Sequence, residues 1–378
     1  MHAGTLIATI LRHDYKTASY KIALIRSLND LVLGYAYLGE SGVPLAVPLR
    51  SLATFWIAYF WPFVSTAQPI KQGVHPANKQ DISFRNSLTQ VRQIWEQTLG
   101  SDSRPSDGFY LVGEFQSSHR RKHYPDDLIS AYSQAIRDIS KAIQQPVRYA
   151  GGPGHYNVFN PPQTWQVLQS NTHMIPIPGT QPEDRCLVVD PELWASFNEL
   201  SLWIEALCIH EWSLFVENIS GVNRGVIYSL LTDRPGNRSP LTWERNQVEI
   251  LMLEGHHFEC PWTGKILTTK SYDLDHLLPL SAYPINELWN LVPADVNFNR
   301  KKKRDRMPGA SALRIAQPRL AKAYENYIIS QTLETALRED ALVRFEGKVI
   351  LSDLPNSLAA CTTQFIQTIA NARNLASF

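Results

Sequence analysis

A chain of 378 residues is long enough for two domains and a sizeable buried core. Its apolar and charged fractions are those of a soluble globular protein, and its net charge of +1 excludes a protein that coats polyanions through overall positive charge. Any affinity for nucleic acid must therefore come from local basic patches.

The first part of the chain has helical periodicity. Apolar residues share one face of a helix predicted over 19–37, and Gly and Pro then end it. The aromatic segment 52–64 is too short to cross a bilayer before Pro62, so we predict a buried core helix and no membrane contact. A base-stacking platform is the alternative, and the scarcity of interleaved charges disfavours it.

Residues 66–81 read as a polar loop, 85–100 as a helix, 101–108 as a linker and 109–115 as a short strand. The basic run His119–His123 is either a solvated loop or a phosphate contact. A well-patterned helix follows over 126–144. The glycine-rich stretch 151–154 does not predict a P-loop, because no Lys-Ser/Thr follows it.

A third group of helices is predicted before residue 254. Asp190-Pro191 is a helix start, and the apolar spacing continues to about Asn218. A short helix with a turn-rich linker should occupy 221–238, and another helix 241–253. The four cysteines lie far apart and contain no CxxC pair, and we see no secretory signal. A reducing compartment is therefore expected, and we predict a cytoplasmic protein.

The segment from Cys260 to Pro308 contains most of the chemistry. It places Asp275-His276, then Asn290-Leu291, and then Asn299 before a basic run within a short stretch. Asp275 is a hard carboxylate ligand for a magnesium-type ion, and Asn299 offers a neutral carbonyl oxygen. His276 can take a proton from water near physiological pH. Because alternation sends neighbouring strand residues to opposite faces, the Asp-His pair requires a strand end or bend.

The segment resembles the HNH endonuclease family, which has the ββα-metal nuclease fold. The resemblance rests on the opening Cys260–Lys265, on Asp275-His276, on Asn290-Leu291, and on Asn299 with Lys302. It implies that His276 and Asn290 serve catalysis, His276 as general base and Asn290 as a scaffold residue that ties the loop through its amide. It further implies that Asp275 and Asn299 hold one divalent ion, Mg²⁺ in the first place, with Mn²⁺ and Ni²⁺ as alternatives.

A helix is predicted from about Pro293, with Asp295 near its positive end. Asn299, Lys302 and Arg306 should share one of its faces. We expect the nearby cations to hold nucleic acid. These are Arg300, Lys302, Lys303, Arg304 and Arg306. Taken alone, such a run is usually a solvated helix face, and a lone Asp-His dipeptide is usually a surface pair.

One departure from the family pattern concerns a structural zinc that many members hold by two cysteine pairs. The corresponding positions are Cys260, Thr263, Asp295 and Phe298. A single cysteine does not make a tetrahedral zinc site, so no structural zinc is expected. Apolar packing of Trp262, Trp289 and Phe298 should replace it.

The sequence therefore predicts a mainly α protein with a small α+β part. Residues 1–240 form a helical region, 241–330 the ββα-metal nuclease domain, and 331–378 a helical C-terminal decoration. Metal-dependent hydrolysis of DNA is the predicted activity, with RNA not excluded, and restriction or anti-phage defence is the role suggested by analogy. Two alternatives are a catalytically silent nucleic-acid-binding module and a nuclease subunit of a larger guided or sensing assembly, docked through residues 1–240.

Overall fold

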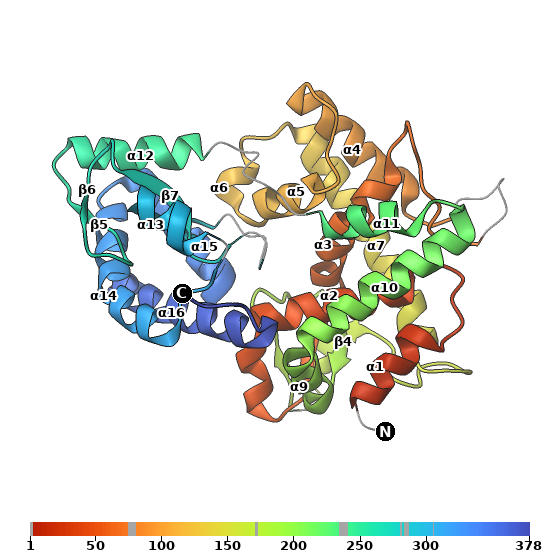
Figure 1. The fold of residues 1–378 in the computed structure, drawn as a ribbon. Coiled ribbons are helices and arrows are strands. Elements are labelled where there is room, and N and C mark those ends of the chain that lie inside the picture. Colours follow the sequence, from red (N-terminus) through yellow and green to blue (C-terminus); the bar gives the residue numbers. More distant parts are fainter. Residues whose placement is uncertain are drawn as a thin grey trace. The chain divides into compact units, whose positions relative to one another are not determined.

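The computed structural model describes residues 3–74, 81–170, 173–233, 241–279, 282, 287–304 and 306–378 (Figure 1). The chain divides into two compact units, which are described separately. The first contains Met1–Val112 and His123–Asp233, and the second contains Gly113–Lys122 and Arg234–Phe378. The expected domain boundary at residue 240 and the turn-rich linker before it fall in 234–240, outside the described residues.

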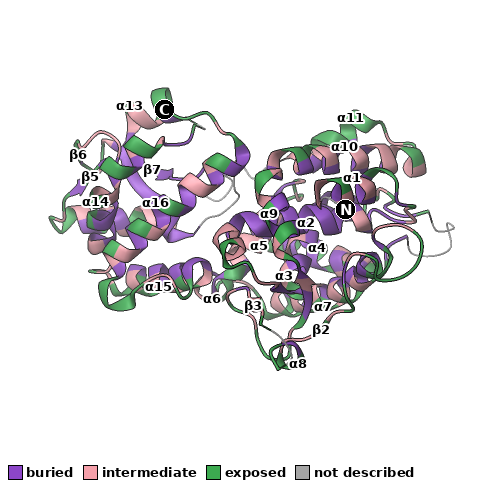
Figure 2. Cartoon of the chain, turned by 90° about the horizontal axis from the view of Figure 1, so that it is seen from below, coloured by how far each residue is buried: buried purple, intermediate pink, exposed green. Residues whose placement is uncertain are grey.

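The first unit is mainly helical, as its periodicity indicates. Its central helix, α2 (Tyr20–Gly34), is buried on every side except at Lys21, and it packs against α3, α7, α9 and α10 (Figure 2). A helix buried all round belongs to the core of a unit. The helices of this unit, including α5, which runs on into the second unit, are α1 (Ala3–Arg12), α2, η1 (Ala36–Ser41), α3 (Leu49–Phe60), η2 (Trp61–Val64), α4 (Arg85–Leu99), α5 (Asp107–Gln116), α7 (Asp126–Tyr149), α8 (Trp165–Leu168), α9 (Pro191–Glu199), α10 (Ser201–Ser220) and α11 (Arg224–Thr232).

The aromatic segment forms α3 and η2 and lies in the core. Trp56, Phe60 and Trp61 are fully buried. The Phe60 ring packs edge-on against Phe84 at 5.0 Å between centroids. The predicted core helix is therefore confirmed, and its aromatic faces are covered by other side chains. Among the described residues, no helix has the length and apolar character that a bilayer crossing requires.

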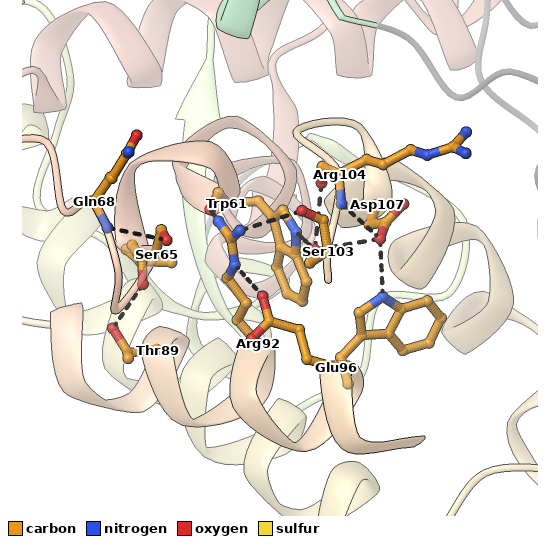
Figure 3. A network of polar contacts seen from close by, with 11 residues as sticks. Trp61, Ser65, Gln68, Thr89, Arg92, Glu96, Ser103, Arg104 and Asp107 are labelled. Atoms are coloured by element: carbon orange, nitrogen blue, oxygen red, sulfur yellow. Dashed lines mark hydrogen bonds and ion pairs between the residues drawn. The ribbon is translucent and has the colours of Figure 1, made fainter. Parts of the chain in front are cut away.

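The segment 109–115, predicted as a strand, is part of helix α5, and that prediction is wrong. Figure 3 shows the polar network at the start of this helix, where Asp107 accepts hydrogen bonds from Trp95 Nε1, Ser103 Oγ and the backbone N–H of Arg104. Leu111 and Phe115, one turn apart, are both buried. The apolar residues of 109–115 fit both the strand and the helical spacing. The Asp107 carboxylate in the first turn favours the helix.

A small sheet in the first unit has no counterpart in the sequence analysis. Its strands are β1 (Leu45–Pro48), β2 (Gln163–Thr164), β3 (Ile175–Pro176) and β4 (Arg185–Val189), in the order β2-β4-β1-β3. β1 pairs antiparallel with β4 and parallel with β3. Each strand has five residues or fewer, and β1 lies between prolines that read as helix breakers, so no run was long enough to show alternation.

Two predicted helices are each divided. The segment 190–218 forms α9 and α10 with a break at Leu200, and 310–340, whose apolar spacing also predicts a helix, falls into α14 (Ala310–Tyr327) and α15 (Gln331–Phe345). The second break has a local cause, since the Ser330 side chain accepts a hydrogen bond from the Leu333 N–H and starts a new helix. The first break was not predictable in this way, because the apolar spacing continues across Leu200 and no residue there indicates a helix end.

The second unit contains the nuclease-like segment. The hairpin β5 (Phe258–Glu259) and β6 (Ile266–Leu267) is followed by the antiparallel pair β7 (Tyr272–His276) and β8 (Leu291–Asp295) and then by a short helix. This order of two strands and a helix confirms the predicted fold class. The other elements of this unit are α6 (Ser118–Arg121), α12 (Thr242–Leu253), η3 (Leu288–Asn290), α13 (Val296–Phe298), η4 (Asn299–Lys303), α14, α15, η5 (Leu351–Asp353) and α16 (Leu354–Arg373).

The C-terminal helices form the core beneath these strands. Helix α14 packs along α16, and two of its tyrosines donate to the backbone at the start of β8. Tyr324 donates to the Trp289 carbonyl at 2.6 Å and Tyr327 to the Leu291 carbonyl at 2.8 Å. Residues 331–378 therefore belong to the same compact unit as β7 and β8.

Candidate active site

Strand β7 separates its alternating side chains between two faces. Asp273 and Asp275 share one face, and His276 is the last residue of the strand. Asp275 pairs with Val292 and His276 with Leu291 in the β7–β8 register. The Asp275-His276 pair thus lies at a strand end, as the alternation argument requires.

Asp275 is buried beside a lysine. Lys303 Nζ donates to Asp275 Oδ1 at 2.9 Å and to the His276 carbonyl at 2.7 Å. The other carboxylate oxygen, Oδ2, is buried and has no hydrogen-bond partner within the described part of the chain. Burial raises the pKa of the Asp275 carboxyl, and the Lys303 ammonium opposes this rise. The buried indole N–H of Trp262 is near enough to help lower the same pKa, although its geometry falls short of a hydrogen bond.

A second ion pair fixes the helix over the same face of β7. Arg300 donates to both carboxylate oxygens of Asp273, each at 2.9 Å. Arg300 and Lys303 lie one helical turn apart, and their partners lie two residues apart on the strand. The segment α13–η4 therefore runs along the face that carries Asp273 and Asp275. Asn299, half-buried, directly precedes Arg300 on this segment, so the structure brings the two predicted metal-ligand segments together.

Asn290 holds the chain that leaves β7. Its side-chain oxygen accepts from the Leu278 N–H at 2.7 Å, and its amide nitrogen donates to the Leu278 carbonyl at 3.2 Å. Its backbone carbonyl accepts from the Leu277 N–H at 2.8 Å. Asn290 is 0% exposed. Its side chain therefore does not face solvent, and its bonds fix Leu277 and Leu278, the two residues that follow the strand end at His276.

The helix differs from its predicted form. Pro293 lies within β8, opposite Leu274, and the helix begins at Val296 with Asp295 as its N-cap, accepting from the Phe298 N–H at 2.8 Å. A two-stranded ladder tolerates this proline because both of its strands are edges. The helix ends in a π-helical turn at Lys303, and Arg304 has a positive φ of 49°. Arg306 therefore lies beyond the helix, off the face expected to carry Asn299 and Lys302.

The predicted phosphate-binding cations divide into two groups. Lys302, Arg304 and Arg306 are exposed, and so is Arg300, which also pairs with Asp273. Lys303 is 1% exposed and pairs with Asp275, so its ammonium does not face solvent. The expectation that Lys303 contacts nucleic acid is not met by this geometry, because one position along the helix separates an outward from an inward side chain.

The positions that hold zinc in many family members contain other contacts. Lys265 Nζ and Asp295 Oδ2 form an ion pair at 3.2 Å between the opening hairpin and the helix start. The Phe378 ring packs edge-on against both Trp262, at 5.4 Å, and Phe298, at 5.3 Å. Trp289 instead packs against Phe345 and Phe365. Sequence reasoning missed Phe378, since no local pattern links it to a segment so far before it.

A buried ionic network binds the residues that directly precede Asn290 in the chain. Asp340 on α15 accepts from Arg120 Nη2 at 3.0 Å and from the Leu288 N–H at 2.6 Å. Burial raises the pKa of Asp340 to about 6, opposed by Arg120. Beside this pair, Arg344 donates two hydrogen bonds to the Glu287 carboxylate, at 2.6 and 3.1 Å. The basic run His119–His123 therefore contributes Arg120 to the interior, which is neither of the two roles considered from sequence.

The residues present fit a divalent ion of the magnesium type. Asp275 Oδ2 is a buried carboxylate oxygen without a partner among the described residues, and Asn299 lies on the helix that covers the same strand face. Mg²⁺ is usually bound by one or two protein oxygens with water and phosphate completing its shell. Within the described residues there is no group of three or more His, Cys, Asp or Glu side chains arranged to hold a metal.

Comparison with known proteins matches two parts of the chain. Residues 1–231 match a family described as a domain of unknown function, DUF8808, and residues 260–309 match the HNH endonuclease family. No curated protein and no solved structure matches the chain. The second match begins at the turn of the opening hairpin and includes every residue predicted above for metal binding and catalysis, together with the basic run from Arg300 to Arg306.

Proposed function

The chain belongs to the DUF8808 family through residues 1–231 and contains an HNH endonuclease domain at 260–309, and we propose that it hydrolyses DNA phosphodiester bonds with a divalent metal ion. One observation carries this proposal. A buried carboxylate oxygen that has no partner among the described residues lies next to a histidine at a strand end, and Asn290 bonds to the residues that follow this end.

In the proposed reaction, an imidazole nitrogen of His276 takes the proton from the attacking water. Asp275 and Asn299 would hold the ion, which when bound neutralises charge on the phosphate and the leaving oxygen. Asn290 keeps the His276 backbone at a fixed distance from β8 through Leu277 and Leu278.

The exposed cations Lys302, Arg304 and Arg306 would hold the DNA backbone. Such contacts give affinity without sequence readout. Because contacts to phosphate carry no base information, sequence specificity has to come from elsewhere in the protein or its partners.

A second candidate function is a catalytically silent nucleic-acid-binding module. The Lys303–Asp275 pair favours it, since an ammonium already occupies one oxygen of the carboxylate that would hold the ion and offsets its single negative charge. This candidate retains the exposed basic residues and predicts DNA binding without cleavage.

Nicking of a supercoiled plasmid separates the two candidates. The wild-type protein should nick in Mg²⁺ or Mn²⁺ and lose this activity in EDTA. His276→Ala should reduce the rate by about 10²–10⁴-fold, the usual contribution of a general base. His257→Ala, which truncates an exposed histidine of the same unit, is the matched control and should retain full activity. Equal nicking by wild type and His276→Ala would refute the assignment, and binding without nicking in any of these ions would establish the silent module.

A further inference from the structure

A cavity in the first unit lies apart from the nuclease site and has no role in the proposal above. It has a volume of about 730 Å³, within the range of small-molecule sites. One side is the loop between α1 and α2, from His13 to Ala18, and the other is the end of α7 with the glycine-rich stretch that follows. Both segments lie in the part of the chain that matches DUF8808.

Asp14 connects the two sides of the cavity, and the charge of its carboxylate is balanced by a lysine. Its Oδ2 accepts from Lys21 Nζ at 2.9 Å and from the Gly151 N–H at 2.8 Å. The carboxylate is nearly inaccessible. Asp14 therefore holds the two loops together. With Lys21 beside it, the pair presents no net negative charge to a ligand.

Lys16 is a lining cation that, among the described residues, has no carboxylate oxygen hydrogen-bonded to it. It lines the cavity, is half-buried, and donates to the Asp14 carbonyl at 3.0 Å. Two acidic groups act on it, Asp14 and Glu211, and each already has another basic partner, Lys21 and Arg12 respectively. Partial burial lowers the pKa of Lys16, and an anion beside a partly desolvated ammonium is held more strongly than one in open water.

Aromatic rings line the same cavity. Tyr149 lies at its wall with its ring against His155 at 5.1 Å, edge to face. Tyr15, on the opposite loop, is 80% exposed although it is a large aromatic residue. Exposed rings beside cations provide a stacking surface for a planar base. A site for a simple anion would not require them.

The glycine-rich stretch gives the cavity a backbone wall. Gly152 and Gly154 both have φ of 104°, which only glycine adopts readily, and a Cβ on Gly152 would meet no atom within 4 Å. From sequence this stretch does not qualify as a phosphate loop, because no lysine follows it. Lys16, from a different segment, lines the same cavity.

We propose that this cavity binds a nucleotide, with its phosphate at Lys16 and the glycine-rich backbone and its base against Tyr149. A mononucleotide such as AMP or GMP carries both the phosphate and the planar base that these groups would bind. The proposal does not depend on nuclease activity, since the cavity lies wholly within the first unit.

Titration calorimetry of the full chain with AMP, GMP, adenosine and inorganic phosphate tests the proposal. AMP or GMP should bind, and Lys16→Met and Tyr149→Ala should each raise the Kd at least tenfold. Lys141→Met is the matched control, because this lysine lies on α7 with a side chain 76% exposed, and it should leave the Kd unchanged. Melting temperatures of all variants show whether each one is folded.

Three results would overturn the proposal. The first is no binding of either nucleotide at millimolar concentration by a folded wild-type protein. The second is an unchanged Kd in folded Lys16→Met. The third is binding of inorganic phosphate as tight as that of AMP with no effect of Tyr149→Ala, because the base would then contribute nothing.

Discussion

Lys303 and Asp275 form an ion pair at 2.9 Å in which the side chains are only 1% and 6% exposed. The pair joins the end of the helix to the strand that carries the candidate metal ligand. It leaves one carboxylate oxygen, Oδ2, buried and without a partner among the described residues. The same carboxylate thus has one oxygen bonded to Lys303 and one that could bind a metal ion.

Removing the lysine should destabilise the second unit strongly. Lys303→Met leaves a buried carboxylate without its partner, which costs about 3–5 kcal/mol in free energy of unfolding. Urea denaturation measures this change. The double variant Lys303→Met/Asp275→Asn should recover a large part of the loss, because it removes the uncompensated charge. A Lys303→Met variant as stable as the wild type would show that the pair contributes little, and equal losses in the single and double variants would show that the uncompensated charge is not the cause.

Asn290→Ala should lower both stability and activity. It removes two buried hydrogen bonds to Leu278 and leaves two backbone groups unsatisfied, at a cost of about 1–3 kcal/mol for each buried group. Asn290→Asp keeps the acceptor but buries a carboxylate against the Leu278 carbonyl, so it should also lose stability. Chemical denaturation and plasmid nicking follow the two effects. An Ala variant with wild-type stability would contradict the positioning role.

The metal ligands can be tested without activity. Mn²⁺ should raise the melting temperature of the wild-type protein, and EDTA should reverse the rise. Asn299→Ala removes one ligand oxygen and should reduce the shift, while Asn297→Ala, an exposed residue on the same short helix, should keep it. Equal shifts in both variants would exclude Asn299 as a ligand.

DNA affinity should depend on the exposed cations of the basic run. Lys302→Gln should weaken binding at low salt and reduce the slope of log K against log salt by about 0.9 if this lysine neutralises one phosphate. Lys322→Gln, on α14 and similarly exposed, is the control. Fluorescence anisotropy at several salt concentrations gives the slopes. An unchanged slope for Lys302→Gln would remove this lysine from the interface.

Asp340 should make stability depend on pH. Its pKa in the folded protein, raised by burial to about 6, exceeds the ordinary value of 3.8. The folded state therefore binds the proton more tightly than the unfolded state, and the contribution present below pH 3.8 is lost as pH rises through 6. Relative to Asp340→Asn, the wild-type protein should lose roughly 1 kcal/mol per pH unit in this window. Urea denaturation from pH 4 to 7 measures the free energy of unfolding of both proteins. A wild-type protein that gains stability relative to Asp340→Asn as pH rises would contradict the assignment.

The sequence predicted what short-range chemistry determines. The order of Asp275, Asn290 and Asn299 located the strand pair and the helix, and Asp295 was correctly placed at the start of that helix. The position of Pro293 in a strand was missed, because proline is equally suited to a first helical turn and to an edge strand. The π-helical turn was missed as well, and so was the inward position of Lys303, which pairs with Asp275.

Contacts between distant segments could not be predicted. The ion pair of Arg120 with Asp340 joins residues 220 positions apart, and the ring of Phe378 packs on Trp262. Periodicity describes the face of an element and says nothing about which other element covers it. A single sequence therefore located the candidate site and left most of its supporting contacts unseen.

Helix α6 is encoded inside the DUF8808 match, yet it is part of the unit that contains the HNH match. A genetic crossover between residues 231 and 260 would join an Asp340 from one parent to an Arg120 from another. Swapping nuclease modules among relatives at this point would therefore succeed only where both parents retain this pair, so the two regions are expected to be inherited together.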